Sequence, residues 1–217
     1  GYAENITVMA GYVADFLKNK GYRGNIFTTG NPSFDSLIEI DSDDRDRLKE
    51  KLGIASHDHV ILWVCPSAPV SMIGRAFIKT SEMLRFLDHF CSRNKGYRYL
   101  VRQHPNKPVV GHTLSERGAL CPTSVSIEDC LNIADCVLLE TSTVGLQAAL
   151  LGLPVVTVNA GNYPPYAPLG LSLDVPSLKA AEKALLEAEK PRLDLLCYPS
   201  VGSATDQVMA VVNRLLN

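Results

Sequence analysis

The sequence predicts an α/β fold in which a parallel β-sheet is covered by helices on both faces. From about residue 54 to residue 176, strand and helix patterns alternate in the order β-α-β-(β)-α-β-α-β, and parallel strands need such crossovers. Residues 60–65 (VILWVC) form a nearly continuous apolar run, which is typical of a strand buried on both sides. The 46% of hydrophobic residues in 217 positions excludes a disordered chain and suffices for a core without disulfide or metal.

The elements are expected in this order along the chain. Apolar residues at helical spacing predict a helix from Met9 to Leu17, closed by Gly21, and a short strand follows at 25–29. The acidic stretch 41–44 lies where negative charge favours a helix start. These parts form a lead-in, residues 1–53, that we expect to pack on the main domain, residues 54–217.

Within the main domain, strands are indicated by short apolar or β-rich runs and helices by apolar residues at helical spacing. The expected strands are 60–65, 97–102, 119–123 (weak), 136–139 and 154–158. The expected helices are 74–93, one capped by Ser126, 146–151 ending at Gly152, one capped by Ser177, and a last one carrying Val208 to Leu216.

Charge and composition argue against several partners. The 21 basic and 23 acidic residues give a net charge of −2, so neither nucleic acid nor an anionic membrane surface is an expected partner. The longest apolar stretch, 146–158, is broken by Gln147, Gly152 and Pro154, so no transmembrane segment is expected. No signal peptide is visible. The six cysteines form no C-x-x-C pair and are expected to be buried thiols in the cytoplasm.

Four loops follow the carboxyl ends of the expected strands, where open α/β sheets bind ligands. The loop 140–145 (ETSTVG) places three hydroxyls, on Thr141, Ser142 and Thr143, beside Gly145 at a helix start. Hydroxyl donors and a helix start suit a phosphate. Gln147 follows one turn later, within reach of a ribose hydroxyl. The alternative is that Ser142 only caps the helix.

The other three loops carry further candidates. Arg102 and His104 end the strand 97–102 and can bind an anion, and His104 can also act as a general acid. Ser67 follows the strand 60–65 and can contact a phosphate or an acceptor sugar. The last loop supplies Asn162, Tyr163 and Tyr166, which can stack on a base or a sugar or only pack in the turn. The loops carry no carboxylate pair at metal spacing, so no metal site is expected.

Three segments together resemble the C-terminal nucleotide-binding domain of GT-B-fold glycosyltransferases and the related UDP-N-acetylglucosamine 2-epimerases. Residues 29–37 (TGNPSFDSL) resemble the stretch that enters the second domain of that family. Residues 102–105 (RQHP) resemble the His-Pro motif of capsule-type transferases, including those that use CMP-sugars. Residues 142–155 (STVGLQAALLGLPV) resemble the family's STVGLEA…GkPV signature.

The resemblance implies a Rossmann-like second domain that binds a nucleotide-sugar donor, UDP- or CMP-linked, as its substrate, with no other cofactor. It implies that Ser142 and Thr143 contact the donor phosphates, that position 147 binds ribose, and that His104 is catalytic and neutralises the leaving phosphate. A glycan or lipid-linked acceptor would bind a domain upstream of Gly1. The fragment alone would then be inactive, and any contact with the inner membrane would involve other parts of the protein.

Two departures from the family pattern bear on the reaction. Gln147 stands where the family usually has Glu, which leaves open a non-catalytic nucleotide-sugar-binding module. The epimerases continue after the Gly-Pro segment with an Arg-rich stretch, whereas this chain has residues 157–166 (TVNAGNYPPY). The sequence therefore favours a glycosyltransferase of surface polysaccharide synthesis over an epimerase.

Overall fold

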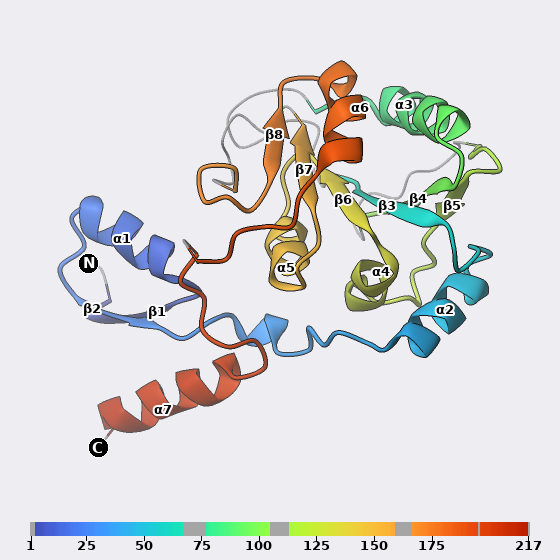
Figure 1. The fold of residues 1–217 in the computed structure, drawn as a ribbon. Coiled ribbons are helices and arrows are strands. Elements are labelled where there is room, and N and C mark those ends of the chain that lie inside the picture. Colours follow the sequence, from blue (N-terminus) through green and yellow to red (C-terminus); the bar gives the residue numbers. More distant parts are fainter. Residues whose placement is uncertain (1–2, 67–76, 105–112, 159–165, 195, 217) are drawn as a thin grey trace. The chain divides into compact units, whose positions relative to one another are not determined.

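The main unit of the computed structural model is built on a six-stranded parallel sheet (Figure 1). The structure describes residues 3–66, 77–104, 113–158, 166–194 and 196–216. In spatial order the strands are β5 (Gly118–Leu120), β4 (Tyr97–Arg102), β3 (His59–Val64), β6 (Cys136–Leu139), β7 (Val155–Val158) and β8 (Leu173–Val175). The predicted fold class, a Rossmann-like parallel sheet between helices, is confirmed.

The strand order reverses at the centre of the sheet. The chain builds β3, β4 and β5 outward to one edge, then returns to pair β6 with β3 and continues outward through β7 and β8 to the other edge. Ile61 pairs with Cys136 in the central ladder. Loops that leave the carboxyl ends of β3 and β6 therefore diverge, and this reversal opens a crevice in doubly wound sheets.

Helices cover both faces of this sheet, as the buried strands require (Figure 1). Helices α3 (Thr80–Arg93) and α6 (Leu178–Glu187) lie on one face, and α4 (Ile127–Ile133) and α5 (Val144–Leu150) lie on the other. Trp63, Tyr99 and Leu138 of the sheet share one core cluster with Leu87 and Phe90 of α3. Burial on two sides explains why the central strands carry almost no polar residue.

The helix ends follow the signals expected from the sequence. The Asp41 carboxylate accepts the N–H of Asp44 at 2.9 Å at the start of α2 (Ser42–Lys51). Ser126 Oγ accepts the N–H of Asp129 at 2.9 Å at the start of α4. Gly152 ends α5 with φ +70°, a left-handed conformation that glycine adopts without strain.

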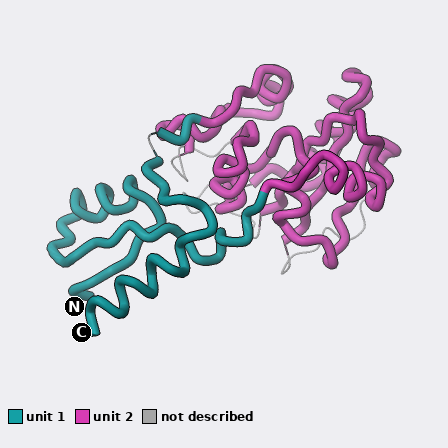
Figure 2. The backbone as a smooth tube through the Cα atoms, turned by 60° about the horizontal axis from the view of Figure 1, so that its bottom comes forward, with its two compact units in different colours: residues 1–38, 192–217 teal, residues 39–191 magenta. Residues whose placement is uncertain are grey.

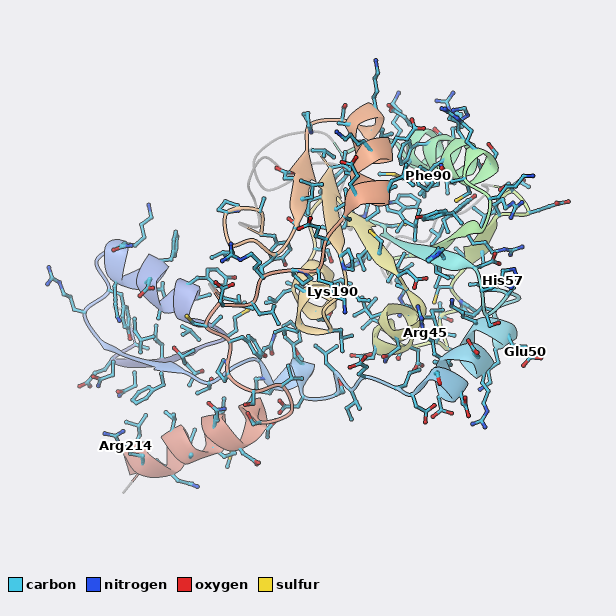
Figure 3. All side chains as sticks on the ribbon, in the orientation of Figure 1. Arg45, Glu50, His57, Phe90, Lys190 and Arg214 are labelled. Atoms are coloured by element: carbon cyan, nitrogen blue, oxygen red, sulfur yellow. The ribbon has the colours of Figure 1, made fainter. Side chains whose placement is uncertain are left out.

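Helix α2 belongs to the main unit and not to a separate lead-in. Its Arg45 donates to the carbonyls of Asn132, Ile133 and Ala134 at the end of α4 and pairs with Asp135 at 2.7 Å (Figure 3). The guanidinium thus satisfies carbonyls that a helix end leaves without partners. The compact main unit, unit 2, accordingly spans residues 39–191.

The second compact unit, unit 1, combines residues 1–38 with residues 192–217 (Figure 2). Its elements are β1 (Asn5–Val8), α1 (Gly11–Asn19), β2 (Asn25–Thr28), the 3-10 turn η1 (Pro32–Phe34) and α7 (Ala204–Leu216), with β1 and β2 parallel. The Asp35 carboxylate accepts the N–H groups of Ala204 and Thr205 at 2.9 and 2.8 Å. This contact fixes the start of α7 in unit 1.

These units differ from the boundary expected at residue 53. Arg45 ties α2 to unit 2, and Asp35 ties α7 to the first strands. The short strands β1 and β8 were not predicted as strands, and α5 begins at Val144 rather than at residue 146. Ladder pairing with β2 and β7 defines β1 and β8, and a single sequence carries no direct sign of such pairing.

Candidate nucleotide-binding site

A cavity of about 400 Å³ opens at the carboxyl edge of the sheet in unit 2. Its walls come from the ends of β3 and β4, the loop between β6 and α5, and the first residue of α4. The residues that line it are Val64, Cys65, Arg102, Gln103, His104, Ile127, Thr141, Ser142, Thr143 and Val144. The cavity thus lies where the strand order reverses, which is where this class of sheet binds ligands.

The loop after β6 presents hydroxyl groups to this cavity. Thr141, Ser142 and Thr143 all line it. Ser142 Oγ accepts the N–H of Val144 at 3.2 Å, and the Ser142 carbonyl accepts the N–H of Gly145 at 3.1 Å. Ser142 therefore supports the turn into α5, although the N-cap residue of the helix is Thr143. The bond to Val144 uses the oxygen as acceptor, so the Ser142 hydroxyl proton stays available to a ligand oxygen.

Gly145 allows the loop to be held from behind by Tyr166. A Cβ atom at position 145 would lie 2.6 Å from Cε2 of the Tyr166 ring and 3.1 Å from Cδ2 of Leu139. The Tyr166 hydroxyl donates to the Ser142 carbonyl at 2.8 Å. Only glycine at position 145 lets the Tyr166 ring come this close. Together, Gly145 and Tyr166 fix the turn that carries the hydroxyl groups at the cavity wall.

Arg102 is anchored on the far side of the cavity by backbone carbonyls. Its Nη1 donates to the carbonyl of Val125 at 2.7 Å and to that of Pro122 at 3.4 Å, and it contacts Cys121 Sγ at 3.4 Å. The group keeps its charge at any physiological pH. It therefore places a fixed positive charge at a wall that also carries three hydroxyls, and this combination suits a phosphate.

Two buried acidic groups lie beside the cavity. Glu140, 2% exposed, accepts the N–H of Ile78 at 2.8 Å. Its burial, together with the charge of Glu82, raises its pKa to about 7 against the opposing bond from Ile78. Burial, and then the charge of Glu140, raises the pKa of Cys65 to about 12. Cys65 is thus a neutral thiol and not a thiolate nucleophile at neutral pH.

The structure brings together five of the predicted site residues. Arg102, His104, Thr141, Ser142 and Thr143 all line the cavity. Gly145 lies directly behind it. Gln147 is only 7% exposed and does not line it, so its expected contact with ribose has no support in this geometry. Ser67, Asn162 and Tyr163 lie outside the described residues, and their roles stay predictions.

For Tyr166 the sequence left two alternatives, stacking on a base or sugar and packing in the turn. The residue is 3% exposed and its ring packs against Gly145, which favours packing over the predicted contact with a base or sugar. Its surroundings make it a support for the loop after β6.

Sequence reasoning also missed cavity residues. Ile127 lines the cavity and follows the loop 121–126, which leaves the carboxyl end of β5. Loops at the carboxyl ends of four strands were considered from the sequence, and the same criterion applies to this fifth loop. Glu140 was within the quoted motif, but nothing in a sequence reveals that its carboxyl is buried.

Comparison with known proteins identifies the fold. No protein-family model and no curated protein matches the sequence. Solved structures match over nearly the whole chain. The wall teichoic acid polymerase TagF superposes with a TM-score of 0.63 at 16% identity over 97% of this chain and 58% of its own. MnaA of S. aureus, solved with UDP, superposes with a TM-score of 0.71 at 14% identity over 99% of this chain and 60% of its own.

A third solved structure also matches nearly the whole chain at low sequence identity. The UDP-GlcNAc 2-epimerase of Methanocaldococcus jannaschii, in complex with UDP-GlcNAc and UDP, gives a TM-score of 0.68 at 13% identity over 98% of this chain and 61% of its own. The chain thus spans about three fifths of the length of these proteins. Over this length, the fold of the chain is that of the matching parts of TagF, MnaA and the 2-epimerase.

Among the described residues, no three His, Cys, Asp or Glu side chains gather as metal ligands would. Over the same residues, no helix combines the length and the apolar character needed to cross a membrane.

Proposed function

We propose that this chain is the donor-nucleotide-binding part of a sugar-nucleotide-dependent glycosyltransferase of surface polysaccharide synthesis. The observation that carries the proposal is the cavity at the reversal of strand order, which Arg102 and His104 line together with the hydroxyl-bearing residues 141–143. One fixed cation, one imidazole and several hydroxyls can surround a diphosphate or monophosphate without a metal.

The proposed chemistry is stabilisation of a leaving phosphate. When the bond between the sugar anomeric carbon and the phosphate oxygen breaks, its electron pair stays on that oxygen and negative charge grows there. Arg102 offsets this charge, and His104 donates a hydrogen bond or a proton to the same group. His104 is the catalytic residue in this proposal, and Arg102 is a phosphate-binding residue.

The proposed donor is a UDP- or CMP-linked sugar. Among the solved structures of this fold, MnaA was solved with UDP, and a TagF variant was soaked with CDP-glycerol, so pyrimidine nucleotides recur in this fold. The acceptor, a glycan or a lipid-linked glycan, would bind a further domain of a longer cytoplasmic protein. On this proposal residues 1–217 bind a donor but transfer nothing alone.

An epimerase-like domain is the second candidate, because UDP-GlcNAc 2-epimerases match the fold as well as the polymerase does. The sequence of residues 157–166, which lacks an Arg-rich stretch, favours the transferase. With UDP-GlcNAc and the full-length protein, an epimerase would change the sugar without an acceptor, whereas a transferase would release nucleotide when its acceptor is present. A non-catalytic binder, the third reading, would retain the nucleotide-sugar unchanged.

Nucleotide binding is the first test. With UDP, CDP, CMP and GDP added at roughly 100 times their dissociation constants, the best ligand should stabilise the folded chain by about 2.7 kcal/mol. This corresponds to a rise of roughly 5–10 °C in the midpoint of thermal unfolding. A rise with a pyrimidine nucleotide and none with GDP is the expected pattern. If no nucleotide moved the midpoint, the donor-site proposal would fail.

His104→Ala tests the role of the cavity itself. Loss of one bond to a charged phosphate should weaken UDP or CMP binding by about tenfold, with an unchanged circular dichroism spectrum. His89→Ala, an exposed position on α3, is the matched control and should bind as the wild type does. Equal affinity of the two variants, measured by calorimetry, would remove His104 from the site.

A further inference from the structure

Two cysteines stand almost in bonding contact beside the cavity. Cys121 directly follows β5 and Cys130 lies in α4, and both are buried, at 3% and 0% exposure. Their Sγ atoms are 2.9 Å apart, with neither bonded to the other as a disulfide. A disulfide bond is about 2.05 Å long, so a movement of about 1 Å separates the two thiols from a covalent bridge.

The segment between these cysteines holds Arg102. The guanidinium donates to the carbonyls of Pro122 and Val125, both inside the segment, and contacts Cys121 Sγ. Ile127, also inside the segment, lines the cavity together with Arg102. A bridge between Cys121 and Cys130 would therefore close the loop on which Arg102 is held.

The two thiols differ in character. The hydrogen bond from Cys130 lowers the pKa of Cys121, the Arg102 guanidinium lowers it further, and burial opposes both. The bond to Cys121, with burial, raises the pKa of Cys130. Burial raises the pKa of Cys91 and of Cys136 to about 12. Cys121, which the Arg102 guanidinium contacts, is thus the thiol of the pair that loses its proton more readily.

We propose that Cys121 and Cys130 are a redox modification site that forms a reversible disulfide next to the nucleotide cavity. The oxidant is a peroxide, small enough to reach a buried sulfur when the segment opens briefly. The Cys121 thiolate attacks one peroxide oxygen, the O–O bond breaks, and the departing hydroxide takes up a proton to form water. The Cys130 sulfur then attacks the resulting sulfenic acid, and its thiol proton leaves with the hydroxyl as a second water. A dithiol reverses the oxidation.

Oxidation also constrains the groups that hold Arg102, and this part of the inference rests on the proposed function. Cys121 Sγ and the carbonyls of Pro122 and Val125 contact the guanidinium. A bridge to Cys130 would close the segment that carries all three groups. Oxidation is therefore expected to change the affinity for UDP by roughly threefold or more.

Peptide mapping of the 217-residue chain tests the modification. The chain carries Cys197→Ser, because Cys197 is exposed and would link two chains. After treatment with hydrogen peroxide and alkylation of the remaining thiols, the peptides containing Cys121 and Cys130 should be joined, and dithiothreitol should separate them. The closed loop should raise the midpoint of thermal unfolding by about 5 °C. Alkylation of both residues after peroxide, as in the untreated chain, would overturn the proposal.

Two variants sharpen the test. Cys130→Ser should abolish the rise in the midpoint, whereas Cys91→Ser, a buried cysteine of α3, should keep it. If either variant fails to fold, the peptide map of the parent chain decides alone. UDP affinity is then measured in the oxidised and reduced samples. A disulfide with unchanged affinity would refute the coupling to Arg102, and absence of UDP binding in both samples would count against the proposed function but not against the disulfide.

Discussion

Gly145→Val is expected to destabilise unit 2 by about 3 kcal/mol and to abolish nucleotide binding. Even a Cβ atom would lie 2.6 Å from the Tyr166 ring. That ring is buried, and its hydroxyl is bonded to the Ser142 carbonyl. The ring therefore moves away only if the turn that carries Thr141, Ser142 and Thr143 moves with it. Urea unfolding measures the loss of stability, and calorimetry with UDP measures the loss of binding.

A double-mutant cycle identifies the cause. Tyr166→Leu removes the ring and the hydroxyl, so as a single substitution it should lower the free energy of unfolding. In the double variant, Gly145→Val should then lower the free energy of unfolding much less than it does in the wild type. Gly145→Ala should have a smaller effect, because alanine favours the helix by about 1 kcal/mol over glycine. Strictly additive effects of the two substitutions would show that Gly145 is not required for contact with Tyr166.

Glu140→Gln is expected to remove a large part of the pH dependence of stability between pH 4.5 and pH 7. The pKa of Glu140 rises from 4.5 to about 7 in the folded chain, chiefly through burial. Its folded-state pKa is thus above the unfolded value, so the group favours folding below pH 4.5. This contribution, about 3 kcal/mol, is lost as the pH rises through 7, because the unfolded chain gives up the proton first.

Urea unfolding at several pH values measures how the free energy of unfolding changes with pH. The wild type should lose stability between pH 4.5 and 7, and the loss in Glu140→Gln should be smaller by about 3 kcal/mol. The slope is the measured quantity, because the buried amide changes the absolute stability at every pH. Glu189→Gln, at an exposed position, should keep the wild-type slope. Parallel curves for Glu140→Gln and the wild type would show that Glu140 ionises alike in both states.

The sheet was predictable because its strands are buried on both faces. Residues 60–64 and 136–139 are continuous apolar runs, and each is followed by a loop with polar residues. The same reasoning missed β8, since Leu173–Val175 is too short to show a pattern. It also missed the association of α7 with the first strands, because Asp35 and Ala204 are 169 residues apart and no local signal joins them.

The site was predictable to the extent that it depends on strand ends. Arg102, His104 and the hydroxyls of 141–143 were selected because they follow strands whose carboxyl ends share one edge, and they share one cavity. For Tyr166 two alternatives stayed open, because a sequence does not show which side of a ring is covered. The pair Cys121–Cys130 was read as two ordinary thiols, since their closeness arises only when β5 and α4 pack.

The discontinuity of unit 1 has a consequence for the order in which the chain folds. Residues 1–38 leave the ribosome before residues 39–191, and α7 follows only after residues 39–191 have been made. Unit 2 is continuous in sequence, so it can complete its own core while the first strands still lack their helix. Closing unit 1 joins segments more than 150 residues apart, such as Asn31 and Tyr198, and a folded unit 2 shortens the flexible span that must be closed. Assembly of unit 1 thus follows the synthesis of unit 2, and it depends on how quickly unit 2 folds.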